Sequence, residues 1–354
     1  MYNANTPPAS VCILRLSAIG DTCHVLPVIR TLQRAWPDAR FTWIIGKLEA
    51  KLLGHLPDIE FIVVDKKSGT LAARRKLKAA LRGRRFDVLM HMQLSMRASV
   101  LSTAIPATIK LGFDRSRARE LQWWFTNQRI ALAARQHVMD SLFGFAEKFD
   151  VYDKVLRWDI PIPDAAREYA QRLIPEPGNT LIISPCSSHR LRNWRPEYYA
   201  EVADYAIASL GMRVILCGGP SDIERRTGEA IVARMKHGCE NAIGKDTLLQ
   251  LLATLERATA LITPDSGPAH MGTTVGTAVI GLYAATNPAR SGPYLSRQWC
   301  VDKYDVAARR LLGRPAAELP WTTKIERPGV MDLITPDDVI KKLHALLLSL
   351  TRRK

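Results

Sequence analysis

An acidic side chain follows the first apolar run of the chain, in the stretch RLSAIGDTCHVLP from Arg15 to Pro27. The run VCILRLS (11–17) is typical of a buried strand, and Asp21 follows it where a helix is expected to begin. Open parallel sheets bind their ligands beyond the carboxyl ends of the strands. Asp21 therefore has two candidate roles, a helix cap stabilised by the helix dipole and a general base that takes a proton from a bound hydroxyl.

A second polar cluster follows an apolar run near the middle of the chain, in the stretch SPCSSHRLRNWRP. The hydroxyl and guanidinium groups of Ser187, Ser188 and Arg192 can bind phosphate oxygens, although the same residues would also suit an ordinary polar turn. A later turn, CGGPSDIE, places Asp222 and Glu224 at the start of a helix. Carboxylates at that position can bind ribose hydroxyls or cap the helix.

A third polar cluster lies in TPDSGPAHMG, where an apolar run ends at Asp265 and a helix rich in small residues begins. Gly267 lets the backbone approach a ligand closely, and the N–H groups after Ser266 can bind an anion. Asp265 can accept hydrogen bonds from sugar hydroxyls or cap the helix. His270, one turn into the helix, suits either a ligand contact or a packed side chain.

Short apolar runs alternate with helical stretches through both halves of the chain, and this alternation is typical of a parallel sheet covered on both faces. Four further runs in the first half are FTWIIG (41–46), EFIVVD (60–65), DVLMHMQ (87–93) and TIKLGF (108–113). The runs of the second half are TLIISPC (180–186), RVILCGG (213–219), ALITPDS (260–266) and AVIGLYAA (278–285).

This alternation predicts an α/β chain with two Rossmann-like, parallel-sheet domains facing an interdomain cleft. A proline-rich stretch, IPIPDAAREYAQRLIPEPGN, separates the two series of runs, so we place the N-terminal domain at 1–164 and the C-terminal domain at 165–335. The amphipathic stretch PDDVIKKLHALLLSL lies in the remaining residues, 336–354. We expect this helix to pack back toward the N-terminal domain.

The chain is strongly basic, with a net charge of +16 over 354 residues, and the charge is concentrated in the first half. Residues 1–160 contain 25 Lys and Arg against 14 Asp and Glu, which gives +11. The densest run, from Lys66 to Arg85, has nine basic residues and no acidic one. Such a run favours an anionic partner, which could be nucleic acid, anionic lipid or a phosphorylated substrate, or it forms a solvated basic helix without a partner.

Several classes of protein are disfavoured by what the sequence lacks. Its six cysteines form no CxxC pair and it has no HExxH, so neither a structural zinc site nor a zinc protease is expected. Neither G-x-G-x-x-G nor G-x-x-x-x-G-K-[ST] follows a predicted strand, which disfavours a dinucleotide dehydrogenase and a P-loop ATPase. No apolar stretch approaches the roughly 18 residues of a membrane span. The first residues do not read as a signal peptide, so we expect a cytoplasmic protein.

The motifs of the two halves, taken in order, resemble those of the ADP-heptose:lipopolysaccharide heptosyltransferases. The first half carries R-x-S-x-x-G-D-x-x-x-x-L-P from Arg15, Q-x-x-x-R-A from Gln93, ARE at 118–120 and a histidine at His137. The second half carries NWRPEYYAE, GGPSD, DSGPAH and GLYAATNPARSGPY. Each motif alone is weak, but the ordered set is specific and covers most of the chain.

The resemblance implies a two-domain GT-B glycosyltransferase that uses an ADP-sugar and requires no cofactor or metal. Asp21 matches the catalytic base of the family, which would deprotonate the acceptor hydroxyl as it attacks the anomeric carbon with inversion. The C-terminal domain would bind ADP-heptose, with a cation and amides stabilising the leaving diphosphate. The residues implied in donor binding are Ser187, Ser188, Arg192, Asp222, Glu224, Asp265, Ser266, Gly267 and His270.

The N-terminal domain would bind the acceptor. For Arg119 the alternative role is a salt bridge with Asp114 or Glu120. The residues that the family motifs imply in acceptor binding are Ser17, Gly20, Gln93, Arg97, Arg119 and His137.

The chain departs from the family pattern at three places. Arg192 and Arg97 stand where the family commonly has lysine, which keeps the charge but changes the geometry of the contact. His91 stands where an acidic residue precedes the glutamine motif. Asp246 begins a polar stretch where an apolar platform for adenine is expected.

The resemblance predicts an inverting heptosyltransferase (hexosyl-type transfer) acting from ADP-L-glycero-D-manno-heptose onto the lipopolysaccharide inner core, either Kdo-lipid A or a heptosylated core. It would be peripheral on the inner face of the cytoplasmic membrane, with its basic run on the anionic surface. The alternatives are a related GT-B transferase for another nucleotide sugar and a basic nucleic-acid-binding protein. The sequence has no aromatic RNA-binding motif or recognition module, so we expect no nucleic acid partner.

Overall fold

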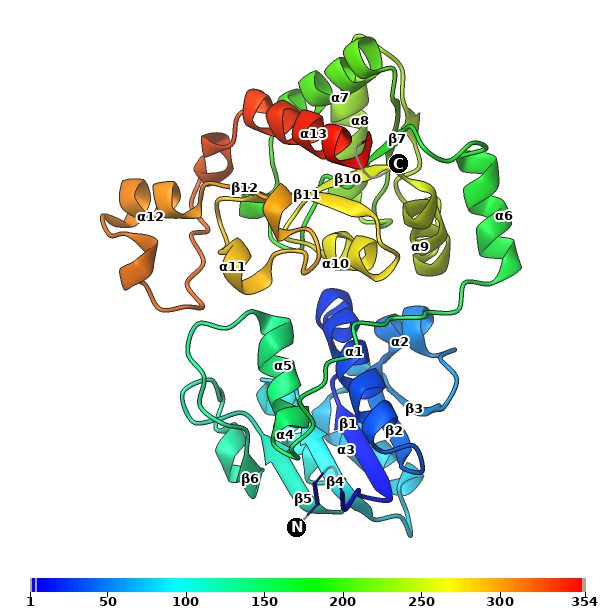
Figure 1. Cartoon of the computed structure of the whole chain (residues 1–354), viewed down its shortest axis with the longest axis vertical. Coiled ribbons are helices and arrows are strands. Elements are labelled where there is room, and N and C mark those ends of the chain that lie inside the picture. Colours follow the sequence, from blue (N-terminus) through cyan, green and yellow to red (C-terminus); the bar gives the residue numbers. More distant parts are fainter. Residues whose placement is uncertain (1, 4, 352–354) are drawn as a thin grey trace. The chain divides into compact units, whose positions relative to one another are not determined.

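The computed structural model describes residues 2, 3 and 5–351, and contacts within the chain divide it into two compact units (Figure 1). Unit 1 is Met1–Pro161 and unit 2 is Ile162–Lys354. Each unit contains one parallel sheet with helices packed on it, which confirms the predicted α/β class with two Rossmann-like sheets. The assignment of the acceptor to one unit and of the donor to the other stays a prediction.

The sheet of unit 1 has six parallel strands, which lie in the order β3 (Ile59–Val64), β2 (Arg40–Gly46), β1 (Ser10–Leu14), β4 (Phe86–His91), β5 (Ala107–Gly112) and β6 (Gln128–Arg129). The central strand β1 is buried from Val11 to Leu14, which explains its continuously apolar sequence. In this order the strand sequence reverses between β1 and β4. The loops after these two strands therefore border the crevice in which such sheets bind ligands.

The helices of unit 1 pack in two groups, as expected for helices on opposite faces of the sheet (Figure 1). One group is α1 (Ile19–Ala35), α2 (Lys47–Leu53) and α5 (Val138–Glu147), and the other is α3 (Thr70–Ala80) and α4 (Met96–Ser102). Every residue of α1 from Thr22 to Leu32 is buried, whereas Asp21 in its first turn is partly exposed. The burial of α1 therefore fixes the position of the first turn.

The sheet of unit 2 repeats the same order from the other edge, as β12 (Val301–Asp302), β11 (Ala278–Tyr283), β10 (Ala260–Pro264), β7 (Thr180–Ile183), β8 (Arg213–Leu216) and β9 (Glu240–Asn241). All its strand pairs are parallel. The strand sequence reverses between β7 and β10, so the loops after these strands border the second crevice. The helices are α6 (Asp164–Leu173), α7 (Pro196–Leu210), α8 (Asp222–Val232), α9 (Leu248–Arg257), α10 (Gly267–Thr274), α11 (Pro288–Ser291), α12 (Tyr304–Leu312) and α13 (Pro336–Thr351).

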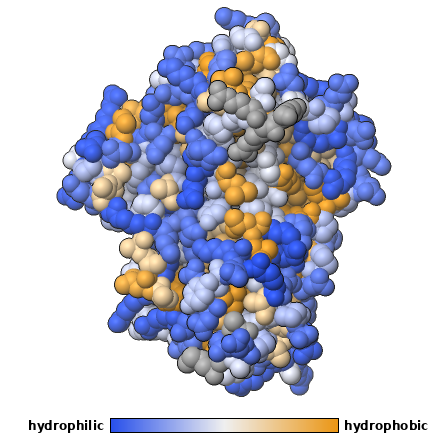
Figure 2. Space-filling model, in the orientation of Figure 1, coloured by the Kyte–Doolittle hydropathy of each residue, from blue (hydrophilic) through white to orange (hydrophobic). Residues whose placement is uncertain are grey.

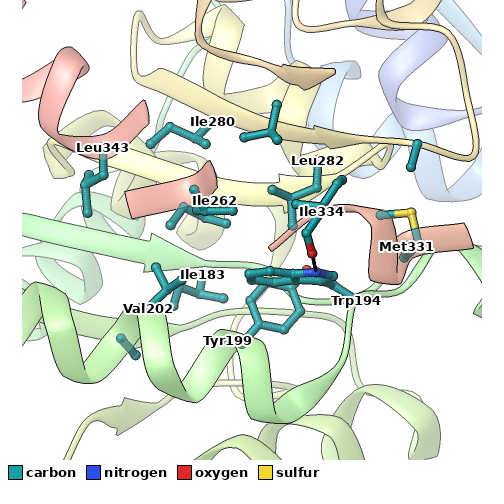
Figure 3. Packing of buried hydrophobic residues seen from close by; sticks show 14 of the residues in the cluster. Ile183, Trp194, Tyr199, Val202, Ile262, Ile280, Leu282, Met331, Ile334 and Leu343 are labelled. Carbon is teal, nitrogen blue, oxygen red and sulfur yellow. Dashed lines mark hydrogen bonds between the residues drawn. The ribbon is translucent and has the colours of Figure 1, made fainter. Parts of the chain in front are cut away.

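The core of unit 2 joins the sheet to α7 and to the last segment of the chain (Figure 3). Trp194 packs edge-on against Tyr199, with ring centroids 4.9 Å apart, and its Nε1 donates to the carbonyl oxygen of Ile334 at 3.0 Å. Ile183 and Ile262 of neighbouring strands lie in the same cluster. The indole bond joins residues 140 apart in sequence, so it fixes the C-terminal segment onto the second sheet.

The last helix, α13, belongs to unit 2, where it contacts α7 and β11. Its buried residues Val339, Leu343 and Leu346 are part of the core of unit 2. The apolar face of α13 thus packs within unit 2, and the expectation that this helix packs back toward the N-terminal domain stays a prediction. The amphipathic pattern predicted a buried face, but a pattern alone does not say which sheet receives it.

The face of the chain shown in Figure 2 is largely hydrophilic, with smaller hydrophobic areas between the hydrophilic ones. Among the described residues, no helix is both long enough and apolar enough to cross a membrane.

Candidate active site

In both units, candidate residues follow the two strands that border the crevice of the sheet. In unit 1, Asp21 follows β1 and Gln93 follows β4. In unit 2, Arg192 follows β7 and Asp265 follows β10. The strand order therefore brings together, within each unit, side chains that are far apart in sequence and lie where Rossmann-like sheets bind ligands.

Asp21 lies in the first turn of α1, where a buried arginine holds its carboxylate. Arg15 Nη2 is 2.5 Å from Asp21 Oδ2, and the backbone N–H of Ala18 donates to the same oxygen at 3.1 Å. The side chain of Asp21 is 36% exposed, against 10% for Arg15. The carboxylate is thus held in place and still accessible, as a group that takes a proton from a bound hydroxyl must be.

Arg15 and Gln93 tie the loop that carries Asp21 to the end of β4. Arg15 Nε donates to the carbonyl oxygen of Ser17 at 2.8 Å, and its Nη1 donates to that of Met92 at 2.5 Å. Gln93 Oε1 accepts from the backbone N–H of Ser17 at 3.2 Å. Two residues predicted to bind the acceptor, Ser17 and Gln93, therefore also hold the loop in shape.

Gln122, in the loop after β5, supports the same site and was not predicted from the sequence. Its side chain is fully buried, and Nε2 donates to the carbonyl oxygens of His91 at 2.8 Å and Gln93 at 3.3 Å. Its Oε1 accepts from the backbone N–H of Phe113 at 3.1 Å. One buried amide thus satisfies backbone groups at the ends of two neighbouring strands.

A buried ion pair lies against the loop after β1. Glu49 is 2% exposed, and Lys66 Nζ donates to its two carboxylate oxygens at 3.0 and 3.2 Å. The same Nζ donates to the carbonyl oxygen of Leu16 at 3.4 Å. A Cβ at Gly46 would collide with Leu16 and Glu49, so this close approach requires glycine. Lys66 therefore belongs to the site, although it opens the basic run.

The other predicted acceptor residues divide into exposed and buried ones. Arg97, in the first turn of α4, and Arg119, in the loop after β5, are exposed, and Gly20 is buried in α1. His137 is 2% exposed, and its Nδ1 accepts from the backbone N–H of Met139 at the start of α5. Two arginines thus remain well placed for an anionic ligand, whereas His137 caps a helix.

Asp114, one of the two partners considered for Arg119, is paired with Arg117. Arg117 Nε donates to Asp114 Oδ2, and its Nη1 also donates to Gln136 Oε1 at 2.9 Å. Burial would raise the pKa of Asp114, but hydrogen bonds from Ser116 and Arg117 lower it below the ordinary value. Arg117 is therefore a structural residue of the loop after β5.

His91 ends β4 and is fully buried. Its Nε2 lies 3.2 Å from Ser99 Oγ. Burial lowers the pKa of His91 to about 3, and the charges of Arg15 and Lys110 add to the shift. His91 is thus a neutral residue in the core beside the site. The sequence showed only that a histidine replaces an acidic residue of the family pattern, and not that its side chain is buried.

In unit 2, Arg192 lies between two carboxylates. Its Nε and Nη2 donate to Glu326 Oε1 at 2.8 and 2.5 Å, and its Nη1 is 3.8 Å from Asp265 Oδ2. The Arg192 side chain is only 12% exposed. Two donor residues predicted from separate motifs, Arg192 and Asp265, therefore meet, but Glu326 was not predicted because it lies 134 residues from its partner.

Two further basic side chains, His189 and Lys324, lie near Glu326. His189 Nε2 is 3.7 Å from Glu326 Oε2. Burial would raise the pKa of Glu326, but the hydrogen bond from Arg192 and the charges of Arg192, His189 and Lys324 lower it below the ordinary value. Burial, together with the charge of Arg192, lowers the pKa of Lys324. Arg192 and Lys324 thus bring positive charge beside the carboxylates of Glu326 and Asp265, and such cations can bind a diphosphate.

The remaining residues of the β7 and β10 loops present hydroxyls and amides. The backbone N–H of Ser187 donates to Asn193 Oδ1 at 2.8 Å, and Ser188 beside it is exposed. Ser266 stands directly before α10, but its side chain does not cap the helix, and its Oγ is 2.8 Å from Thr263 Oγ1. The start of α10 therefore lies directly after Asp265, with its first N–H groups at the crevice.

Two predicted donor residues at the start of α8 have local partners. Glu224 Oε1 accepts from the backbone N–H of Gly219 at 2.8 Å, and its Oε2 accepts from Ser221 Oγ at 2.5 Å. Asp222 is 2.9 Å from Arg225, one turn along the helix, and is 82% exposed. Glu224 thus fixes the turn after β8. His270, in α10, is 8% exposed.

Asp246 is a partly buried acid beyond β9. Its Oδ2 is buried without a hydrogen-bond partner among the described residues. Burial raises the pKa of Asp246 to about 7, and the charge of Glu224 adds to the rise although the amide of Asp246 itself opposes it. This acid therefore takes up a proton near neutral pH, which its sequence context did not suggest.

The six cysteines are unpaired thiols, and five of them are buried. Burial raises the pKa of Cys23 to about 12, with the Asp21 charge adding to the shift, so this thiol stays protonated beside the site. In the part of the chain that the structure describes, no group of three or more His, Cys, Asp or Glu could hold a metal ion.

Comparison with known families adds independent information. Residues 74–320 match the model of glycosyltransferase family 9 (heptosyltransferase). The chain is 40% identical over 339 residues to the lipopolysaccharide core heptosyltransferase OpsX of Haemophilus influenzae, covering 96% of this chain and 97% of the relative.

Two solved structures show the same architecture. A family 9 glycosyl transferase from Veillonella parvula has a TM-score of 0.79 and 25% identity, over 96% of this chain and 97% of the other. The E. coli heptosyltransferase WaaC with ADP has a TM-score of 0.67 and 21% identity, over 80% of this chain and 91% of the other. The latter similarity concerns the fold alone.

Proposed function

The chain belongs to glycosyltransferase family 9, the heptosyltransferases, and from this premise we propose that it transfers heptose from ADP-L-glycero-D-manno-heptose to the inner core of lipopolysaccharide. The acceptor would be Kdo-lipid A or a core that already carries heptose. The name of the Haemophilus influenzae relative supports the lipopolysaccharide core as acceptor, and the ADP bound to E. coli WaaC supports an ADP-sugar donor.

The observation that carries this proposal is the held and accessible carboxylate of Asp21 beside Arg15. Asp21 takes the proton from the acceptor hydroxyl while that oxygen forms a bond to the anomeric carbon of heptose. The bond between this carbon and the diphosphate oxygen breaks in the same step, and ADP leaves with the electron pair. A single displacement of this kind inverts the configuration at the anomeric carbon. Arg15 acts as a positioning residue because it fixes the carboxylate.

We assign donor binding to unit 2. Arg192 and the N–H groups at the start of α10, from Gly267 onward, stabilise the charge that develops on the leaving diphosphate. The hydroxyls of Ser187 and Ser188 add contacts to the same phosphates, and Asp265 accepts from hydroxyls of the sugar. Because a cation and amides take up this charge, the proposed reaction requires no metal. Asp222, Glu224 and His270 complete the proposed donor set, with the two acids near the ribose.

We assign acceptor binding to unit 1, with the direct contacts made by its exposed arginines. Arg97 and Arg119 suit the carboxylates and phosphates of the inner core, because a guanidinium binds such groups through two parallel hydrogen bonds. Ser17 and Gln93, in the loops after β1 and β4, and Gly20, in the first turn of α1, would lie beside the acceptor hydroxyl, and His137 supports them from the start of α5.

The same acceptor suggests where the protein acts. We propose that it is cytoplasmic and peripheral on the inner face of the membrane, with the basic helix α3 on the anionic surface. Arg75, Lys76 and Lys78 of α3 are exposed. Each basic residue near such a surface contributes about 1 kcal/mol, so a few are enough for reversible binding.

A transfer assay with purified protein tests the reaction. The protein is incubated with a deacylated inner-core acceptor and either ADP-heptose, ADP-glucose or a UDP-sugar, and the products are identified by mass spectrometry and by the anomeric configuration of the new bond. We expect one heptose to be added, with inversion, from ADP-heptose only. Transfer from another nucleotide sugar in place of ADP-heptose would favour the alternative, a related GT-B transferase.

A further inference from the structure

A surface segment of unit 1, residues 113–137, exposes large apolar side chains at the carboxyl edge of the sheet. We call it the edge segment. Trp124 and Leu132 are each 73% exposed, and Leu121 is 37% exposed. Scattered exposed leucines are common, but an exposed tryptophan and leucine on one short segment mark a surface that contacts another phase or molecule.

The edge segment is held firmly, so these side chains are not exposed by local disorder. Arg117 joins three parts of it, since its Nη2 donates to the carbonyl oxygen of Ala131 at 2.5 Å and its Nη1 donates to Gln136 and to Ser141 Oγ at 2.9 Å. Buried Gln122 lies just before Trp124 and donates to the backbone after β4. The segment that carries Trp124 and Leu132 is therefore built into the rim of the candidate site.

The charge around these apolar side chains is positive. Of the acidic residues in the segment, Asp114 is paired with Arg117 and Glu120 is exposed. Trp123 faces the guanidinium of Arg115 at 5.7 Å. Four arginines of the same segment are also exposed: Arg115, Arg119, Arg129 and Arg135.

Tryptophan, leucine and arginine on one surface suit the boundary between water and an anionic bilayer. A tryptophan ring lies at the level of the headgroups, and a leucine reaches the acyl chains. Arginine binds lipid phosphates through its guanidinium while its apolar stem stays in the boundary region. The segment has one exposed acid against four exposed arginines. This excess of positive charge fits an anionic bilayer better than a protein surface of mixed charge.

We propose that the edge segment inserts Trp124 and Leu132 into the surface of an anionic bilayer, so that the rim of the site lies at the membrane. The inference rests on the proposed function, because a lipid-anchored acceptor gives the enzyme a reason to contact a bilayer. It adds an apolar contact to the electrostatic binding by α3. The two contributions respond differently to salt. Charge attraction is screened over about 3 Å at 1 M salt, whereas the burial of apolar side chains is not screened.

The test measures binding to vesicles of phosphatidylglycerol and phosphatidylcholine by sedimentation at about 1 M salt, where the Debye length is about 3 Å. The full chain is compared with a variant that carries Trp124→Ser and Leu132→Ser. We expect the variant to bind about 10-fold more weakly, since it loses most of the apolar area offered to the lipid. The matched control is Leu348→Ser on α13 in unit 2, where a leucine is 61% exposed. We expect this change to leave binding unaltered.

A second measurement locates the contact. Brominated lipids quench tryptophans that reach the acyl region, so we expect quenching in the wild type and its loss in Trp124→Phe. Equal binding of wild type and double variant, or equal quenching in Trp124→Phe, would overturn the proposal. It would also be overturned if the double change abolished self-association of the chain and left lipid binding unaltered, because a second copy would then cover this surface. Transfer to a deacylated acceptor in the double variant separates the two proposals, since its loss would bear on catalysis rather than on lipid binding.

Discussion

The two units share one strand order but differ in how a buried arginine is paired at the crevice. In unit 1, Arg15 is 10% exposed and holds one carboxylate, that of Asp21, which is 36% exposed. In unit 2, Arg192 is equally buried, at 12%, but it lies between two carboxylates that are 15% and 25% exposed. The same topology thus carries two different arrangements of charge, which depend on side chains in the loops and not on the fold.

Equivalent helices of the two units also differ in charge. In each unit one helix connects the third strand in sequence to the fourth, namely α3 in unit 1 and α9 in unit 2. The α3 sequence TLAARRKLKAA has four basic residues and no acid, whereas α9 has one of each, in Glu256 and Arg257. This difference is the reason why the proposed contact with an anionic surface is assigned to unit 1.

The largest expected effect concerns the base of unit 1. Asp21→Asn keeps the size of the side chain and removes its ability to take a proton, so we expect kcat to fall by roughly 10²-fold or more. Initial rates of heptose transfer measure this effect. The isosteric change makes a folding defect improbable as the cause, and an unchanged melting temperature serves as the control. A variant with near-normal turnover would remove Asp21 from the reaction.

The next effect concerns α3, the basic helix of unit 1. Replacing Arg75, Lys76 and Lys78 by glutamine should weaken binding to anionic vesicles at low salt by up to about 1 kcal/mol for each charge. Arg74 is left in place because its Nε donates to Thr103 Oγ1 at 2.7 Å. Vesicle sedimentation over a range of salt measures the effect. Unchanged binding at low salt would make α3 a solvated helix without this role.

The third effect concerns the arginine of unit 2. Arg192→Ala should weaken ADP binding by about 1.5–3 kcal/mol, because a charge-assisted hydrogen bond is lost. Arg192→Lys should restore much of this affinity, since a lysine keeps the charge. Calorimetric titration with ADP measures both variants. Equal affinity of wild type and Arg192→Ala would remove Arg192 from the donor site.

The last effect concerns stability and not function: burial raises the pKa of Asp246 to about 7. The unfolded chain loses this proton near pH 4 and the folded chain near pH 7, so the free energy of unfolding falls as the pH rises between these values. Asp246→Asn should therefore stabilise the protein more at pH 8 than at pH 5, by about 2–3 kcal/mol at 1.36 kcal/mol per pH unit. Urea unfolding at the two pH values measures it, and an equal effect at both would contradict the raised pKa.

The sequence predicted the fold where a pattern extends over several residues. The apolar runs that form β1, β7 and β10 are long enough to indicate buried parallel strands, and they are found as strands. The two-residue strands β6, β9 and β12 were missed, since so short a strand carries no periodicity. The amphipathic pattern of α13 predicted that one face of this helix is buried, but such a pattern does not identify the partner of that face.

The site was predicted in part for a similar reason. Asp21 and Arg192 could be found because each follows a strand within a recognisable motif. Glu326, Gln122 and Glu49 could not, since each acts through a contact with a residue distant in sequence, and no local signal marks such a contact. Gln93 is the opposite case, because its motif was recognised in the sequence but its contact was not predicted. Its Oε1 accepts from the backbone N–H of Ser17 and so holds the loop after β1.

The division of roles between the units is the central claim, and ADP titration of Asp21→Asn beside Arg192→Ala tests it most directly. We expect Asp21→Asn to bind ADP as tightly as the wild type while its transfer rate falls, and Arg192→Ala to bind ADP about 10-fold more weakly or worse. If Asp21→Asn lost ADP binding together with its activity, or if Arg192→Ala bound ADP normally, the assignment of chemistry to unit 1 and donor binding to unit 2 would be contradicted.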